Sequence, residues 1–191
     1  MIIGLTGKKG CGKSTVADII VKHFKFSKAS FATPIKDMLM SMGLTEDEIY
    51  DPKLKEEKLE RFGKSPREML QLLGTEFGRE LIADDVWVRA LEHRIKDADR
   101  VVIDDVRFPN EAEMIRKLGG VVVRVVRAGQ ELGLVDKHVS EQGLSGDLID
   151  KELKNISCYE TDLELAVNRV MEEILYYGAV LNSESECVSG Q

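Results

Sequence analysis

Residues 7–14 read Gly7-Lys8-Lys9-Gly10-Cys11-Gly12-Lys13-Ser14, and this stretch fits the pattern G-x-x-x-x-G-K-[ST] at every fixed position. The apolar run over residues 2–5 before it predicts a buried strand. Apolar residues spaced three and four apart over residues 16–24 after it predict a helix. A phosphate-binding P-loop requires a strand, a glycine-rich turn and a helix in this order, so the flanking pattern disfavours a glycine-rich turn that matches by coincidence.

The residue types of this loop suit the binding of a phosphate chain. Its glycines allow backbone dihedrals that turn successive N–H groups toward phosphate oxygens, and the following helix adds its free N-terminal donors. Lys13 can bring a full positive charge to the transferring phosphates as a catalytic residue, and the Ser14 hydroxyl can ligate Mg²⁺. The expected nucleotide-binding residues are Gly7, Lys8, Lys9, Gly10, Cys11, Gly12, Lys13, Ser14 and Thr15.

The length and composition are those of one globular domain. The chain has 191 residues, 43% hydrophobic and 32% charged, and we expect a single domain over residues 1–181 followed by a disordered tail over 182–191. A formal net charge of −7 argues against nucleic acid as the main partner. No apolar run approaches the roughly 20 residues of a membrane span, which argues against a membrane partner. Three widely spaced cysteines and no recognisable signal peptide predict a cytoplasmic setting.

The rest of the chain alternates between strand and helix patterns. Val101–Ile103 and Val121–Val126 read as buried parallel strands, and the helix between them, residues 111–118, is expected to be capped by Asn110 with Glu113. A strand, a helix and a second strand form a βαβ unit. We therefore expect the α/β class, with a P-loop NTPase fold in which helices flank a parallel central sheet. A last short strand near residue 155 and a helix from Thr161 complete the pattern.

Two further segments are expected to form substrate-binding parts. Residues 32–98 contain helix-start signals at Thr33-Pro34, Thr45 and Ser65-Pro66, and they predict a helical insertion where small-molecule P-loop kinases bind their acceptor. Within this insertion, the charged run 53–61 reads as a solvated helix or a mobile loop. Residues 128–148 are rich in glycine and charge without a sustained period, which favours a lid.

A second chemical signal follows the strand Val101–Ile103. Asp104 and Asp105 lie at its carboxyl end, where ligands bind in α/β sheets, and either aspartate could hold Mg²⁺ beside Ser14. Arg107 comes next and can bind an anionic group with two hydrogen bonds, as a catalytic and substrate-binding residue. The alternative is that the two aspartates only end the strand in a turn, but a P-loop already implies the metal.

Several single residues are candidate substrate-binding or catalytic residues because of their place in the sequence. Arg67, Arg79 and Trp87 lie between the P-loop helix and the Asp104-Asp105 pair, so we expect them to line the acceptor cleft, although each could be an ordinary surface or core residue. In the lid region, Arg127 is the preferred cation for the transferring phosphoryl group. His138 could either contact substrate or be a solvated loop histidine.

Four stretches resemble the bacteriophage-type deoxynucleoside monophosphate kinases. They are Ser30-Phe31-Ala32-Thr33-Pro34-Ile35-Lys36, Leu73-Gly74-Thr75-Glu76-Phe77-Gly78-Arg79, Asp105-Val106-Arg107-Phe108-Pro109-Asn110-Glu111 and His138-Val139-Ser140-Glu141. The third is much more specific than the P-loop, which many families share. The resemblance implies an adenylate-kinase-like fold, ATP–Mg²⁺ as donor and a deoxynucleoside monophosphate as acceptor. It also makes Phe31, Asp105, Glu111, His138 and Glu141 substrate-binding candidates, and a virus-encoded member would act in the host cytoplasm.

The sequence therefore predicts an ATP-dependent kinase acting on a (deoxy)nucleoside monophosphate. One alternative is a related small-molecule kinase, such as one acting on dephospho-coenzyme A. The other is a nucleotide-switched binding module, against which the absence of a guanine-reading N-K-x-D motif counts. The expected partners are small nucleotides, and a homodimer is left open.

Overall fold

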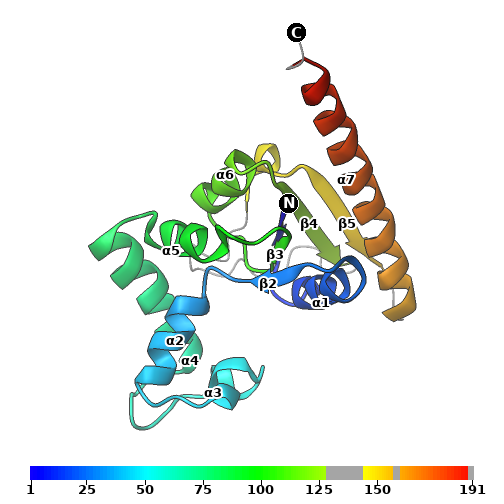
Figure 1. The fold of residues 1–191 in the computed structure, drawn as a ribbon. Helices are drawn as coiled ribbons and strands as arrows, with labels where there is room; N and C mark the ends of the chain where they lie inside the picture. Colours follow the sequence, from blue (N-terminus) through cyan, green and yellow to red (C-terminus); the bar gives the residue numbers. More distant parts are fainter. Residues whose placement is uncertain (128–143, 157–159, 189–191) are drawn as a thin grey trace.

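The computed structural model describes residues 1–127, 144–156 and 160–188, and within them a five-stranded parallel sheet carries helices on both faces (Figure 1). The strands are β1 (Ile2–Thr6), β2 (Ser27–Ala29), β3 (Val101–Ile103), β4 (Val121–Arg127) and β5 (Lys151–Asn155), in the spatial order β2-β3-β1-β4-β5. The helices are α1 (Lys13–Phe24), α2 (Thr33–Ser41), α3 (Glu46–Tyr50), α4 (Pro66–Gln71), α5 (Val86–Ile95), α6 (Pro109–Lys117) and α7 (Glu160–Val188). Short 3₁₀ turns η1 (Leu54–Glu56) and η4 (Gly146–Leu148) and a π-helix, η2 (Leu72–Ile82), complete the described elements. The expected α/β class with a parallel central sheet is confirmed.

Strand β1 occupies the centre of the sheet. It pairs in parallel with β3 on one side, Ile2 opposite Val101, and with β4 on the other, Ile3 opposite Val121. The chain order therefore reverses at β1, and a crevice opens beyond the carboxyl end of such a strand. The P-loop follows β1 directly and Asp104 follows β3, so the topology brings the two motifs to one end of the sheet.

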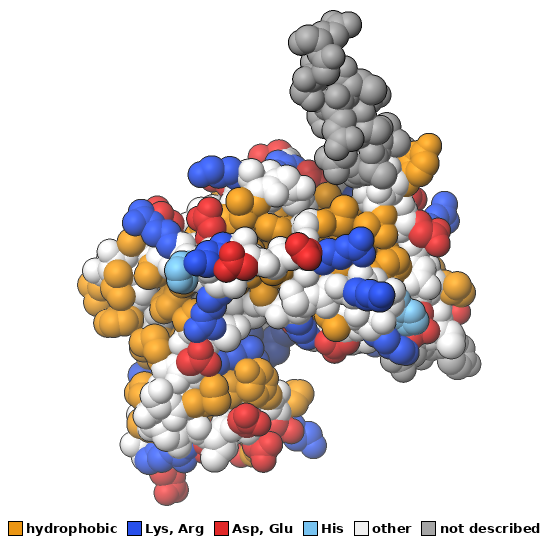
Figure 2. Space-filling model, viewed as in Figure 1, with side chains coloured by type: hydrophobic (Ala, Val, Ile, Leu, Met, Phe, Trp, Pro, Cys, Tyr) orange, Lys and Arg blue, Asp and Glu red, His pale blue; other side chains and the backbone are white. Residues whose placement is uncertain are grey.

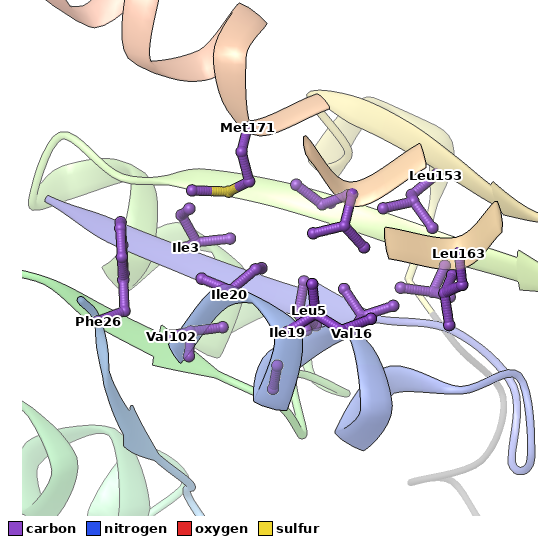
Figure 3. Packing of buried hydrophobic residues seen from close by; sticks show 14 of the residues in the cluster. Ile3, Leu5, Val16, Ile19, Ile20, Phe26, Val102, Leu153, Leu163 and Met171 are labelled. Atoms are coloured by element: carbon purple, nitrogen blue, oxygen red, sulfur yellow. The ribbon is translucent and has the colours of Figure 1, made fainter. Parts of the chain in front are cut away.

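Both faces of the sheet are buried, and the period-two alternation of the strands divides their side chains between two cores. Ile3 and Leu5 point to the face covered by α1 and α7, where they meet Val16 of α1 and Met171 of α7 (Figure 3). Ile2 belongs instead to the opposite core, beneath α5 and α6. Burial on both faces explains why β1 and β3 read as continuous apolar runs.

The helices α2, α3 and α4 form a separate lobe beside the sheet (Figure 1). Its own small cluster contains Leu39, Leu44, Ile49 and Met69, all buried. The expected capping boxes at Thr45 with Glu48 and at Ser65 with Glu68 are both present and start α3 and α4. By contrast, Val88, Leu91 and Ile95 of α5 pack in the sheet core, so this part of the expected insertion 32–98 belongs to the main body.

Several local expectations differ from the structure. Residues 72–82, within the expected helical insertion, form a π-helix, and residues 27–29 form an edge strand. The last strand lies at 151–155, earlier than expected. Helix α7 extends to Val188, so helix continues into the expected disordered tail 182–191. In the described part of the chain, no helix is both long and apolar enough to cross a lipid bilayer.

Candidate active site

The P-loop has the backbone geometry that its glycines predict. Gly7, Gly10 and Gly12 have positive φ angles of 139°, 77° and 102°. A Cβ at position 7 would lie 2.3 Å from the carbonyl oxygen of Val125, and one at position 12 would lie 2.7 Å from the Asn155 amide nitrogen. The loop is therefore pressed against the ends of β4 and β5 at the two positions where a side chain has no room.

Lys13 folds back over this loop. Its ammonium donates to the carbonyl oxygens of Gly7 at 2.7 Å and Lys8 at 3.0 Å. Cys11 is 1% exposed, and its carbonyl oxygen accepts a hydrogen bond from the Asn155 amide at 3.0 Å. Cys11 thus packs beneath the loop, whereas the ammonium of Lys13 is held at its mouth.

A cleft of about 320 Å³ opens in front of the P-loop, bordered by the helical lobe (Figure 2). Of the predicted nucleotide-binding residues, Lys9, Gly10, Lys13 and Ser14 line this cleft. Other lining residues come from the lobe and from the loop between β3 and α6. The further lining residues that sequence analysis had selected are Phe31, Arg67, Arg79, Trp87, Asp104, Asp105, Arg107 and Glu111. The structure therefore gathers residues more than a hundred positions apart into one site.

Besides the P-loop lysines and Arg79, four basic side chains line the cleft: Lys36 of α2, Lys55 of η1, Arg67 of α4 and Arg107. Burial lowers the pKa of Lys55, and the charges of Arg67, Lys36 and Arg107 lower it further, while Glu56 opposes them. The charges of Arg67, Lys36 and Arg107 all act on Lys55, which agrees with their place in the same cleft. Such a group is relieved by an anion, and planar guanidinium groups bind phosphate oxygens in pairs.

Sequence analysis missed two of these four residues. Lys55 lies in the charged run 53–61, whose composition resembles any solvated segment. Lys36 lies within one of the stretches that carry the family resemblance, which was the available signal for it. In both cases the tertiary position, and not the residue type, places the side chain in the cleft.

A carboxylate connects the P-loop to the lobe. Glu56 of η1 pairs with Lys9 at 2.6 Å, and it lies 3.5 Å from the guanidinium of Arg67. Both Lys9 and Glu56 are well exposed at this contact, with side-chain exposures of 55% and 41%. The bridge therefore spans the cleft at its solvent side.

The two aspartates after β3 have different surroundings. The carboxylate of Asp105 accepts from the Ser30 hydroxyl at 2.7 Å and from the backbone N–H groups of Phe31 at 2.9 Å and Ala32 at 3.0 Å. Asp104 instead lies 3.2 Å from the ammonium of Lys28. Asp105 thus holds the turn that leads into α2, and Asp104 has fewer polar partners in the described chain.

Arg79, selected as an acceptor ligand, is held by protein groups. Its guanidinium donates to Glu111 Oε1 at 2.5 Å, to the Asp84 carbonyl and to the Asn110 side-chain oxygen, and it stacks over the Phe108 ring at 3.9 Å. The partner oxygen belongs to a carboxylate that is 3% exposed. Arg79 borders the cleft, yet its hydrogen-bonding groups are directed into the protein.

Glu111 performs the capping that sequence analysis assigned to Asn110 with Glu113. Its Oε2 accepts from the backbone N–H groups of Arg107 at 2.7 Å and Phe108 at 3.1 Å. Helix α6 begins at Pro109, which places Glu111 at the third helical position, where a carboxylate can reach back to the free donors. Burial, and next the charge of Asp105, raise the pKa of Glu111 to about 7, against the opposing effect of Arg79.

Trp87 lies under the apolar part of the cleft. Its indole N–H donates to the Gly74 carbonyl at 2.7 Å, and its side chain is 7% exposed. Leu70, Ile35 and Phe31 line the same region. These four groups supply apolar lining of the cleft.

The remaining candidates have other positions. Arg127, at the end of β4, donates to the Gly10 carbonyl at 3.3 Å, so it lies beside the P-loop. His138 and Glu141 lie outside the described residues, as does most of the expected lid 128–148. Lys8 and Thr15 belong to the loop but do not line the cleft.

Comparisons with known proteins identify the family. A family model described as deoxynucleotide monophosphate kinase matches residues 1–64 and 63–161. A protein of Acanthamoeba polyphaga mimivirus, provisionally named a deoxynucleotide monophosphate kinase, is 33% identical over 199 residues, covering 95% of each chain. The deoxynucleoside-5'-monophosphate kinase of Escherichia phage T5 is 43% identical over 108 residues, covering 53% of this chain and 43% of its own.

The fold itself has relatives among solved structures. The shikimate kinase of Bacteroides thetaiotaomicron superposes with a TM-score of 0.51 at 15% identity, covering 91% of this chain and 98% of that one. This likeness agrees with the parallel sheet and P-loop described above. The family match and the viral relatives lead to one conclusion: the chain belongs to the deoxynucleotide monophosphate kinase family.

Proposed function

We propose that this kinase transfers the γ-phosphoryl group of ATP to a deoxynucleoside 5'-monophosphate, and that both nucleotides occupy the cleft described above. One observation carries the proposal: the P-loop and a group of four further cations, Lys36, Lys55, Arg67 and Arg107, line a single cleft. A donor phosphate chain on the P-loop and an acceptor phosphate on the cations would face each other. In-line transfer between them requires positioning and charge stabilisation and no covalent enzyme intermediate.

The P-loop and its flanking groups would bind the donor. Its backbone N–H groups, with Lys13 after it leaves the loop carbonyls, would hold the β- and γ-phosphates. Arg127, already in contact with the loop backbone, would add a cation at the donor end. Arg127 would therefore act as a catalytic residue from the donor side of the cleft.

The residues present fit a Mg²⁺ ion between the donor side and the acceptor side of the cleft. Ser14 and Asp104 line the same cleft and offer the oxygen ligands that Mg²⁺ prefers. Asp105 fits less well, because three donors already occupy its two oxygens. We therefore assign the metal role to Ser14 and Asp104. The ion, when bound, would neutralise charge on the phosphates.

The four cations would bind the acceptor monophosphate, with Arg107 nearest to the metal-side aspartate in sequence. The apolar wall of Phe31, Leu70 and Trp87 would receive the base. His138 and Glu141 stay candidates from the resemblance alone.

An acceptor screen tests this proposal. We would measure ADP formation from ATP and Mg²⁺ with each deoxynucleoside monophosphate, each ribonucleoside monophosphate, dephospho-coenzyme A, or no acceptor. We expect turnover to depend on a deoxynucleoside monophosphate, and Lys13→Ala to abolish it while the protein stays folded. Lys22→Ala, which changes an exposed lysine of the same helix, is the matched control. Turnover that needs no acceptor, or only dephospho-coenzyme A, would overturn the proposal.

A further inference from the structure

In the sequence, Arg107 lies between two residues, Asp105 and Glu111, whose carboxylates accept hydrogen bonds from backbone N–H groups. Asp105, two residues before it, accepts the N–H groups of Phe31 and Ala32, and Glu111, four residues after it, accepts the N–H group of Arg107 itself. The peptide that carries the Arg107 side chain is therefore fixed from within the protein on both sides. Its side chain lines the cleft.

Glu111 depends in turn on Arg79. The two form an ion pair whose side chains are 9% and 3% exposed, and Arg79 is further fixed by Asn110 and by the ring of Phe108. This pair joins the π-helix η2 to the first turn of helix α6. A buried pair loses much of its value when one partner is removed, because the other charge stays buried without compensation.

We infer that Arg79 and Glu111 are positioning residues that fix Arg107 for the acceptor, and that neither binds the acceptor itself. The inference rests on the proposed function and deepens it, because it assigns a different role to two residues that sequence reasoning placed among the substrate ligands. The hydrogen-bonding groups of Arg79 are directed to protein partners, and both oxygens of Glu111 are used. Their effect on the substrate must therefore pass through the backbone of residues 107 and 108.

The test is a double-mutant cycle between Glu111→Gln and Arg107→Lys, with steady-state constants for acceptor and ATP. We expect each single variant to lower kcat/KM for the acceptor by about ten- to a hundredfold, with KM for ATP changed less than about twofold. The double variant should be no worse than Arg107→Lys alone, because Glu111 acts through Arg107. Additive losses would show that Glu111 contacts the acceptor independently, and would overturn the inference.

The chain supplies a matched control. Asp150 also shares its carboxylate between an arginine fork, that of Arg116 at 2.6 Å, and a backbone N–H, that of Val122 at 2.8 Å, but it lies outside the cleft. Asp150→Asn should lower the melting temperature and leave the kinetic constants of the folded enzyme unchanged. If Glu111→Gln behaves like Asp150→Asn, the pair is only structural and the inference fails.

A milder variant covers the case in which Glu111→Gln does not fold. Arg79→Lys keeps the charge and loses the fork, and its cycle with Arg107→Lys should show the same lack of additivity. Independent, additive losses in that cycle would also overturn the inference. A wild-type enzyme without acceptor-dependent turnover would instead refute the proposed function, so the two failures are distinguishable.

Discussion

Arg107 is the residue at which the proposed acceptor binding can be tested separately from donor binding. It lines the cleft together with Lys36, Lys55 and Arg67. The same substitution that enters the cycle above, Arg107→Lys, keeps the charge and removes the planar fork. On its own it should raise the acceptor KM and lower kcat, with nearly unchanged ATP affinity, at a cost of about 1.5–3 kcal/mol.

Calorimetric melting beside both KM values checks this expectation. Arg94→Lys is a suitable control, because Arg94 pairs with Asp37 on the exposed surface. A loss of thermal stability without any kinetic change would mean that Arg107 only holds its turn. An effect confined to ATP would contradict the acceptor assignment.

The raised pKa of Glu111 predicts that acceptor use depends on pH. Its pKa is raised to about 7, chiefly by burial and then by the charge of Asp105, while Arg79 and two backbone N–H groups favour the ionised form. Only the ionised carboxylate can pair fully with Arg79 and accept both N–H groups. Because protonation follows as pH falls through 7, kcat/KM for the acceptor should fall by up to about tenfold between pH 8 and pH 6.

The acceptor phosphate itself titrates near pH 6, at its second pKa, so the comparison must be made against Glu111→Gln. The ratio of wild-type to variant kcat/KM should shrink as the pH falls, and a constant ratio would contradict the role of Glu111. The stability effect has the opposite sign. Since the folded pKa lies above the ordinary 4.5, the contribution of Glu111 to stability is full below pH 4.5 and is lost as pH rises through 7.

At the scale of elements, the π-helix η2 explains how the cleft gets its apolar wall. Gly78 lies so close to the indole that a Cβ there would be 2.4 Å from Trp87 Cζ2, and Trp87 is fixed by its bond to Gly74. The widened helix therefore lets the indole lie against glycine backbone. π-turns of this kind occur frequently at functional sites.

Gly78→Ala should therefore destabilise the protein, although alanine favours helix by about 1 kcal/mol. Overpacking against a buried indole costs about 1–3 kcal/mol, and Trp87 has little freedom to move. We expect a lower melting temperature and a shifted tryptophan fluorescence. Gly146→Ala, where a Cβ would meet nothing within 4 Å, is the control and should melt like the wild type. Equal melting of the two variants would contradict the packing argument.

The elements also show which features local sequence can predict. The P-loop, the capping boxes at Thr45 and Ser65 and the strand β3 depend on patterns within a few residues, and sequence reasoning found them. The π-helix depends on Trp87, which contacts Gly78 only in the folded chain, so no local pattern could predict it. Glu111 was overlooked as a cap because Asn110 and Glu113 offered a more familiar pattern at the same helix start.

The candidate site divides in the same way. Asp104, Asp105 and Arg107 could be placed beside the P-loop, because the carboxyl ends of parallel strands meet at one edge. The distinct roles of the two aspartates could not, since they depend on Ser30 and Lys28 from another segment. Arg79 looked like a substrate ligand for the same reason: its partner Glu111 lies 32 residues away.

At the scale of the whole molecule, the lobe of α2, α3 and α4 has a core of its own. Leu39, Leu44, Ile49 and Met69 form its cluster, separate from the two cores of the sheet. A region with so few buried apolar contacts should open locally at a lower free energy than the central strands. Its amide hydrogens should then exchange with solvent before those of β1 and β3. An analogue that joins both nucleotides should slow exchange in the lobe more than in the sheet.

Hydrogen exchange followed by mass spectrometry checks this, with α1 as the internal reference. Uniform exchange over lobe and sheet would mean one cooperative unit. If the lobe does open alone, the P-loop stays formed while the acceptor-binding wall of the cleft unfolds and refolds. ATP could then bind whether or not the lobe is folded, whereas the acceptor would bind only the fraction of molecules whose lobe is folded. The apparent affinity for the acceptor would therefore be lowered by the free energy needed to fold the lobe.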